Sequence, residues 1–278
     1  MASTSGHTVW RGTDGYEAYV GRWSRPLAEL FLAWFAAPKG GRWLDVGCGT
    51  GALTAAVLAA ADPIAVAGID PSPEFLGAAQ AAIPDPRARF APGDARALPV
   101  ASGGFDAVVA GLVLNFVPEP AAAVAEMARA ARAGGAVGAY VWDYSGGLQI
   151  TRYFWEAVAA TDPAAAALDP SPRFAMAQPE PLAALFGAAA LGDVVVTALD
   201  LPMVFRNLND FWLPHTIAGA SNAQRYVTAL DNARKAALRE RLRATLPLTA
   251  DGSLRLTGRA WAVRGTKRAA GGGSSGPG

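Results

Sequence analysis

The stretch Leu44-Asp45-Val46-Gly47-Cys48-Gly49-Thr50-Gly51 decides the fold of this chain. It reads as an apolar strand that ends in a glycine-rich turn, and an Ala/Leu-rich helix follows it. Glycine adopts positive φ without strain and lets a ligand approach the backbone closely. The free N–H groups at the start of the following helix favour a negatively charged group. The stretch therefore predicts a binding site for a nucleotide-type cofactor.

Two further acidic residues extend this prediction. The glycine spacing alone fits the general G-x-G-x-x-G/A pattern and does not separate one nucleotide cofactor from another. Asp70 ends the next predicted strand, nineteen positions after Gly51, where a carboxylate accepts both hydroxyls of a ribose; the alternative is that it only starts the turn before Pro71. Asp94, followed by Ala95, ends the third strand and is placed to accept an adenine amino group. Ligands of open α/β sheets bind outside the carboxyl ends of the strands, so these positions should converge on one rim.

Composition limits the class of protein. The chain has 278 residues, of which 52% are hydrophobic and 17% charged, and its formal net charge is +1. This balance predicts a globular protein with small partners rather than a nucleic acid or a membrane. The N-terminus lacks the basic start and apolar core of a secretion signal, so we expect a cytoplasmic protein. The single cysteine, Cys48, excludes an intrachain disulfide and a Cys-based zinc cluster; we expect no metal site, and a small filler at Cys48 rather than a nucleophile.

Short apolar runs alternate with helical ones, which is typical of βαβ units and an α/β fold with a largely parallel sheet. A helix is expected from Ser72-Pro73-Glu74 to Ala82, and another from Pro118 until Gly134-Gly135. After Asp143 the pattern loosens into expected insertions at about 144–190 and 202–250, the second with one long helix over 222–246. Residues 1–14 and 269–278 are predicted to be flexible ends. The expected strands are 42–46, 64–69, 88–91, 105–112, 136–142, 193–201 and 253–265.

These motifs resemble the class I S-adenosylmethionine-dependent methyltransferases, and more narrowly the type 11 group that includes ubiquinone biosynthesis methyltransferases. The resemblance rests on residues 44–51, on Asp70, on Asp94-Ala95 and on Phe105-Asp106-Ala107-Val108-Val109, and it spans about residues 15–265. It implies a Rossmann-like sheet of seven strands with helices on both faces and the last strand antiparallel. It also implies that Gly47, Gly49 and Gly51 pass under the methionine and ribose, that Asp70 holds the ribose and Asp94 the adenine, and that Asn115 lies near the methyl-transfer point.

Electrostatics supports a cationic cofactor independently. Asp45 places a negative charge two residues before the first glycine, which is unfavourable beside a pyrophosphate but favourable near the ammonium of a methionine group. The rings of Tyr16, Tyr19 and Trp23 form either an N-terminal helical flap over a sulfonium or a packing face against the sheet. Arg22, between them, is a candidate partner for the methionine carboxylate. The expected cofactor-binding set comprises Tyr19, Arg22, Asp45, Gly47, Cys48, Gly49, Gly51, Asp70, Pro71, Asp94, Ala95 and Asn115.

Methyl transfer from a sulfonium mainly requires nucleophile, methyl and sulfur to be held in line. Where the acceptor carries a proton, His215 is the candidate base, with Asp143 and Tyr144 as further candidates; a structural role for the lone histidine is the alternative. After the fourth strand the chain reads Asn115-Phe116-Val117-Pro118 instead of the Asn-Pro-Pro-aromatic motif of base-methylating enzymes. The sequence thus predicts methyl transfer to the O, N or C atom of a small, partly hydrophobic acceptor. The alternatives are a dinucleotide-dependent oxidoreductase and a non-catalytic cofactor-binding protein.

Overall fold

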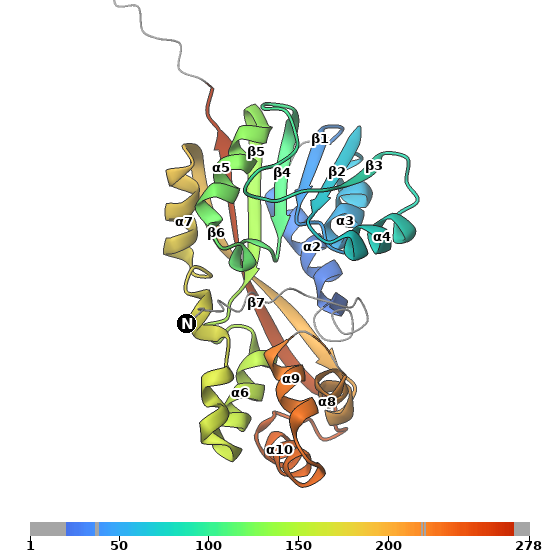
Figure 1. Ribbon diagram of the computed structural model, residues 1–278, viewed down its shortest axis with the longest axis vertical. Coiled ribbons are helices and arrows are strands. Elements are labelled where there is room, and N and C mark those ends of the chain that lie inside the picture. The colour runs from blue at the N-terminus through green and yellow to red at the C-terminus, as the bar shows by residue number, and fades with distance from the viewer. Residues whose placement is uncertain (1–20, 37–38, 218, 220, 270–278) are drawn as a thin grey trace, which may run out of the picture. The chain divides into compact units, whose positions relative to one another are not determined.

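The computed structural model describes residues 21–36, 39–217, 219 and 221–269, and it contains the predicted seven-stranded sheet (Figure 1). The strand order is β3-β2-β1-β4-β5-β7-β6. The elements, in chain order, are α2 (Arg22–Phe35), β1 (Arg42–Val46), α3 (Ala52–Ala61), β2 (Ala65–Asp70), α4 (Pro73–Ala82), β3 (Ala88–Pro92), β4 (Phe105–Gly111), η2 (Leu114–Phe116), α5 (Pro120–Ala130), β5 (Ala131–Trp142), α6 (Gln149–Thr161), η3 (Pro163–Leu168), η4 (Ser171–Phe174), α7 (Pro179–Ala188), β6 (Leu191–Phe205), α8 (Leu208–Thr216), α9 (Asn222–Ala229), α10 (Asn232–Thr245) and β7 (Leu254–Lys267).

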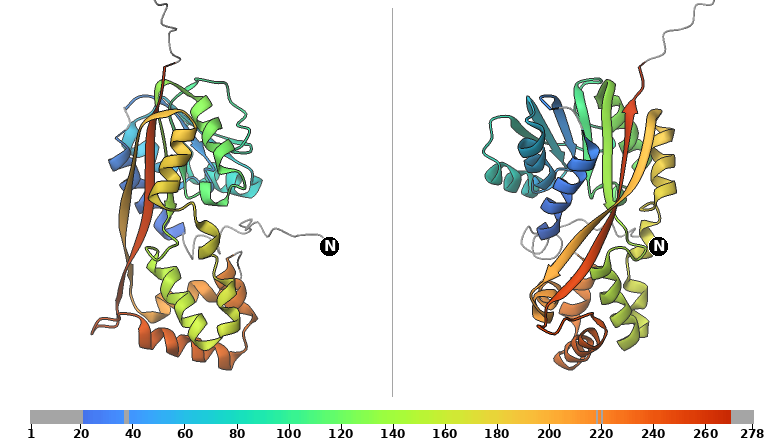
Figure 2. Two further views of the ribbon diagram at one scale, coloured as in Figure 1. Left: turned by 90° about the vertical axis from the view of Figure 1, so that its left-hand side faces the viewer. Right: turned by 180° about the vertical axis from the view of Figure 1, so that it is seen from behind.

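The direction of the strands follows the prediction. β1 pairs in parallel with β2 and β4, β2 with β3, and β4 with β5. β7 is the antiparallel strand, and its arrow runs opposite to that of β6 (Figures 1 and 2). From β1 through β2 to β3 the chain moves toward one edge of the sheet, and from β4 to β5 it moves toward the other edge. Right-handed crossovers therefore place α3 and α4 on one face of the sheet and α5 on the other.

The chain divides into two compact units. The sheet unit comprises the described residues within 31–140, 179–197 and 262–269. Its central strands are buried on both faces, as parallel strands covered by helices are. Phe31 and Phe35, from the end of α2, stack on each other with ring centroids 5.2 Å apart, and Phe31 also contacts Tyr140.

The helical unit comprises the described residues within 21–30, 141–178 and 198–261. In it α6 packs against α10, and α8 packs against α9. Its core is aromatic: Phe154, Phe205 and Phe211 are each at most 1% exposed. Among the described residues, no helix combines the length and the apolar character that crossing a bilayer requires.

Two predicted helices were wrong in extent. The helix expected to reach Gly134-Gly135 ends at Ala130, because Ala131 is already extended and begins β5. The two glycines lie where the pairing of β4 with β5 shifts register, and Gly134 has a φ of 73°. They serve a strand irregularity, which also requires glycine, rather than a helix end.

The long helix expected over 222–246 is two helices, α9 and α10. Leu230 has extended backbone angles, and the Asp231 side chain accepts a hydrogen bond from the Arg234 amide at 2.8 Å. Asp231 is thus the N-cap of a new helix, a signal that was present in the sequence. The predicted N-cap at Ser72 is confirmed, since its hydroxyl accepts from the Phe75 amide at 3.3 Å.

Candidate functional site

The glycine-rich turn joins β1 to α3 and is fastened to the end of β2. The Gly47 and Cys48 amides both donate to the Ile69 carbonyl, at 2.7 and 3.1 Å. Gly47 has a φ of 71°, and a Cβ there would collide with the Val113 side chain. Gly49 also has positive φ, 53°, but a Cβ at this position would meet no atom within 4 Å. Gly47 is therefore a packing requirement, whereas Gly49 exposes bare backbone to open space, where a ligand can approach it.

Asp70, the last residue of β2, holds this turn in place. Its Oδ2 accepts the Gly49 amide at 3.0 Å, and its Oδ1 accepts the Ser72 amide at 2.9 Å. The side chain is nearly buried, and burial raises the pKa of the carboxyl although the two amide bonds oppose that rise. Because each carboxylate oxygen has two acceptor positions, each has one left for a ligand hydroxyl.

Asp45 is a buried acid directly before the turn. Its Oδ2 accepts the Thr54 hydroxyl at 2.7 Å, and its Oδ1 is buried without a hydrogen-bond partner. Burial raises the pKa of Asp45 to about 7, and the neighbouring charge of Asp70 adds to the rise. A buried, unpaired carboxylate oxygen is costly, and a cationic group of a ligand would relieve that cost.

Cys48 is buried within the turn, and burial, followed by the charges of Asp45 and Asp70, raises the pKa of its thiol. Its sulfur lies where a Cβ at Gly68 would come within 3.0 Å. A protonated, enclosed thiol is a poor nucleophile. This environment favours the small-filler interpretation of Cys48.

Asp94 follows β3 and lies beside the end of β2, since the Gly93 amide donates to the Asp70 carbonyl at 3.2 Å. Arg96 pairs with it: Nη2 lies 2.6 Å from Oδ2, and Nε lies 3.1 Å from both oxygens. These bonds to Arg96 keep the pKa of Asp94 below its usual range. Pro71 is exposed and Ala95 is half-buried beside these two acids.

The end of β4 completes the rim. Leu112 has a φ of 61°, a strained conformation for a residue with a side chain. Asn115, in the short η2 that follows, has an Oδ1 that is buried and lacks a hydrogen-bond partner. The predicted residues thus lie at or just after the carboxyl ends of four parallel strands, β1 to β4, and their roles toward a cofactor stay predictions.

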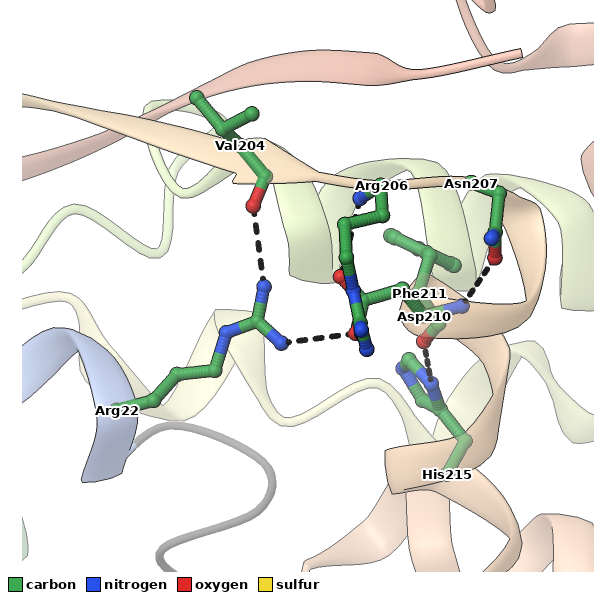
Figure 3. A network of polar contacts seen from close by, with 7 residues as sticks. All are labelled: Arg22, Val204, Arg206, Asn207, Asp210, Phe211 and His215. Atoms are coloured by element: carbon green, nitrogen blue, oxygen red, sulfur yellow. Dashed lines mark hydrogen bonds and ion pairs between the residues drawn. The ribbon is translucent and has the colours of Figure 1, made fainter.

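Arg22 is held inside the helical unit. Its Nη2 donates to the Val204 carbonyl at 3.1 Å, and its Nη1 pairs with Asp210 at 3.3 Å (Figure 3). The guanidinium also lies over the rings of Trp23 and Phe205, at 4.4 and 4.7 Å. These contacts engage the charge of Arg22, so its predicted role toward a carboxylate stays a prediction. Tyr16 and Tyr19 lie outside the described residues.

His215 lies in α8 and is fully buried in the helical unit. Its Nδ1 is 3.0 Å from the Phe211 carbonyl (Figure 3), and its ring stacks on Phe154 with centroids 4.5 Å apart. Burial lowers the pKa of His215 to about 4. This environment supports the structural alternative, and a catalytic role for His215 stays a prediction.

The two other candidates for catalysis follow β5. Asp143 is nearly buried, and its Oδ1 accepts the Ser145 amide at 2.9 Å and the Gln178 side chain at 3.4 Å. The Tyr144 ring contacts the Phe174 ring at 4.3 Å. Their predicted roles stay predictions. No three His, Cys, Asp or Glu side chains in the described ranges are grouped as a metal site would need.

The burial of His215 predicts acid sensitivity of the helical unit. Its folded-state pKa of about 4 lies below the ordinary value near 6.5, so the unfolded chain binds more protons between these values. The stabilisation is complete above pH 6.5 and is lost as the pH falls through 4; the shift corresponds to about 3 kcal/mol. We expect His215→Phe to lose less thermal stability than the wild type between pH 7.5 and 4.5. Equal losses in the two proteins would contradict this.

Sequence reasoning missed three residues of the rim. Thr54 binds Asp45, Val113 lies under Gly47, and Arg96 pairs with Asp94. Only Arg96 left a signal, because an Asp-x-Arg triplet after a strand favours a local ion pair. The other two contacts depend on the tertiary packing of α3 and of the loop after β4.

A comparison with models of known protein families matches the segment that contains this sheet edge. Residues 44–138, which run from β1 through most of β5, match the family model described as a methyltransferase domain, of the type 11 group. These residues belong to the methyltransferase domain family. The domain contains the glycine turn, Asp70, Asp94 and Asn115, all of which lie in the sheet unit.

Two curated methyltransferases and one solved structure are similar to this chain. A demethylmenaquinone methyltransferase of Roseiflexus sp. is 42% identical over 107 residues, which cover 38% of this chain and 44% of that protein. A phosphatidylethanolamine N-methyltransferase of Cereibacter sphaeroides is 40% identical over 103 residues, or 36% of this chain and 49% of that protein. The alignments thus span less than half of each relative.

The third is a structure, phosphoethanolamine N-methyltransferase 2 of Haemonchus contortus in complex with S-adenosyl-L-methionine. It superimposes with a TM-score of 0.57 at 16% identity, covering 92% of this chain and 57% of that one. At this identity the superposition establishes a shared fold.

Proposed function

We propose that this chain binds S-adenosylmethionine at the carboxyl ends of β1 to β4 and transfers its methyl group to a small organic acceptor. The observation that carries the proposal is the contact between Asp70 and Gly49. The Asp70 carboxylate, at the end of β2, accepts the Gly49 amide, and a side chain at Gly49 would meet only open space. Both residues lie in the segment that matches the family model. The methyltransferase relatives support it, and so does the structural neighbour whose complex contains S-adenosylmethionine.

Three polar groups of the rim fit this cofactor as they stand, whereas Asp94 is already paired with Arg96. Asp70 has acceptor positions for ribose hydroxyls, and Asp94 with Ala95 flanks the adenine position. Asp45 and Asn115 each have a buried oxygen without a partner, and an ammonium donates hydrogen bonds that such oxygens accept. When bound, the cofactor supplies an activated methyl group on a positively charged sulfur. The residues of the chain bind and orient it, and proximity then supplies much of the rate.

The acceptor is proposed as a class. The names of the relatives cover a demethylmenaquinone, a phosphatidylethanolamine and a phosphoethanolamine, so they share the methyl transfer and not the acceptor. His215, Asp143 and Tyr144 remain the residues proposed for an acceptor that must lose a proton. The same proposal holds that the acceptor is not a nucleic acid. It also holds that the protein acts in the cytoplasm and has no membrane partner.

Turnover tests this function. The purified chain is incubated with S-adenosylmethionine and a library of small quinols, phenols, amines and phospholipid headgroups, and S-adenosylhomocysteine release is measured. We expect release above the acceptor-free background with at least one class. Binding of the cofactor without release across the library would instead favour a non-catalytic cofactor-binding protein.

Asp45 predicts a pH dependence of cofactor binding. Its pKa of about 7 leaves it largely protonated at pH 6, and an ammonium ligand favours the carboxylate form. Binding should therefore release a proton and weaken about tenfold from pH 7.5 to pH 6. Titration calorimetry in buffers of different ionisation enthalpy measures both effects. In Asp45→Asn, which keeps an acceptor for the Thr54 hydroxyl, the pH dependence should be lost; its persistence would remove Asp45 from the proposal.

A further inference from the structure

Within the described part of the chain, the Asp94 side chain forms its hydrogen bonds with a single residue, Arg96. Its Oδ1 accepts the Arg96 backbone amide at 2.8 Å and Nε at 3.1 Å, and its Oδ2 accepts Nε at 3.1 Å and Nη2 at 2.6 Å. A carboxylate offers about four acceptor positions. Three N–H groups of Arg96 therefore occupy most of these positions, with Nε shared between the two oxygens, so an adenine amino group would compete with the Arg96 side chain for Asp94.

A second acid lies within reach of the same guanidinium. The Arg96 Nη1 is 4.0 Å from Oε1 of Glu119, the residue at the N-cap of α5. Both acids contribute to the raised pKa of Arg96, with Asp94 the stronger. Glu119 is largely exposed, and Arg96 and Asp94 are each partly exposed. The guanidinium therefore lies between two exposed carboxylates, and its shorter contacts are with Asp94.

We infer that Arg96 is a two-position latch on the adenine subsite: paired with Asp94 it blocks the adenine amine, and paired with Glu119 it leaves Asp94 free to bind it. This rests on the proposed function, because it assigns adenine to Asp94. Arg96 is then a residue that sets cofactor affinity. Its two positions differ by the exchange of one partly exposed ion pair for another, which is a small free-energy difference and easily shifted by a ligand.

The latch predicts changes of opposite sign in the affinity for S-adenosylhomocysteine. Arg96→Ala removes the competitor and should tighten binding, by about three- to tenfold for a charge-assisted pair at the surface. Glu119→Gln removes the alternative partner and should weaken binding by about twofold or more. In an Asp94→Asn background, the Arg96→Ala change should no longer tighten binding, because the two residues act on the same subsite.

Arg89→Ala is the matched control. Arg89 is an exposed arginine on β3, and its side chain bonds the Ala88 carbonyl rather than a carboxylate. Its removal takes the same charge from β3, the edge strand that precedes Arg96, so it reports any general effect of charge on binding. We expect its affinity to equal that of the wild type.

Titration calorimetry of these proteins with S-adenosylhomocysteine decides the inference. Tighter binding by Arg96→Ala alone, with weaker binding by Glu119→Gln, supports the latch. Unchanged or weaker binding by Arg96→Ala, or equal tightening by Arg89→Ala, overturns the latch and leaves the proposed function standing. If the wild type does not bind S-adenosylhomocysteine, the proposed function fails and the latch fails with it.

Discussion

Asp70→Ala is expected to weaken S-adenosylmethionine binding by about 1 to 3 kcal/mol, which is roughly 5- to 150-fold, because ribose hydroxyls lose their acceptor. The structure adds a second cost: the Gly49 and Ser72 amides lose the same carboxylate. The turn should loosen, and the melting temperature should fall by a few degrees. Calorimetric titration and thermal melting measure the two effects.

Ligand variants separate the ribose contact from the turn. The wild type should prefer adenosine to 2′,3′-dideoxyadenosine, and Asp70→Ala should bind the two nucleosides alike. Asp85→Ala is the control, since Asp85 accepts the amide two residues later, from Arg87 at 2.9 Å, just as Asp70 accepts that of Ser72. It should keep wild-type affinity. A preference for adenosine that survives in Asp70→Ala would remove Asp70 from the ribose site.

Gly49→Ala is expected to abolish measurable cofactor binding while the fold persists. The added methyl group meets no protein atom within 4 Å, so it projects into the space where the proposed cofactor approaches the backbone. The stability cost is limited to placing alanine at a φ of 53°, which costs about 1 kcal/mol. Affinity for S-adenosylmethionine, compared with the unfolding free energy in urea, measures this prediction.

Gly40→Ala controls for the strain of that backbone conformation. Gly40 has a φ of 76°, a methyl group added there would also meet nothing within 4 Å, and the residue precedes β1 at the strand end opposite the turn. Both variants should lose similar stability, and only Gly49→Ala should lose binding. Equal affinity in the two variants would show that the space beside Gly49 is not the cofactor site.

The sheet was predictable from sequence because its signals are local. Buried parallel strands read as short apolar runs, and Asp70 and Asp94 mark where two of them end. The helix ends were harder to predict from the sequence, because a pair of glycines can mark either the end of a helix or an irregularity in a strand. At Gly134-Gly135 the pairing of β5 with β4 decided between them.

The polar residues that the sequence proposed for a site divide in the same way. Those in the glycine turn and at strand ends follow from topology, which brings parallel strand ends together. The environment of His215 does not, because its burial depends on the ring of Phe154, which comes from α6. The Arg22 contacts likewise depend on Val204 and Asp210, more than 180 positions away.

Calorimetric titration of the wild-type chain with S-adenosylmethionine and, separately, with NADH tests the central claim most directly. In the proposed site, Asp70 binds the adenosyl group and Asp45 the cationic methionine group, whereas a pyrophosphate would lie beside the Asp45 charge. We predict one-to-one binding of S-adenosylmethionine and no detectable binding of NADH. Tight NADH binding with no heat from S-adenosylmethionine would contradict the account and support a dinucleotide-dependent oxidoreductase.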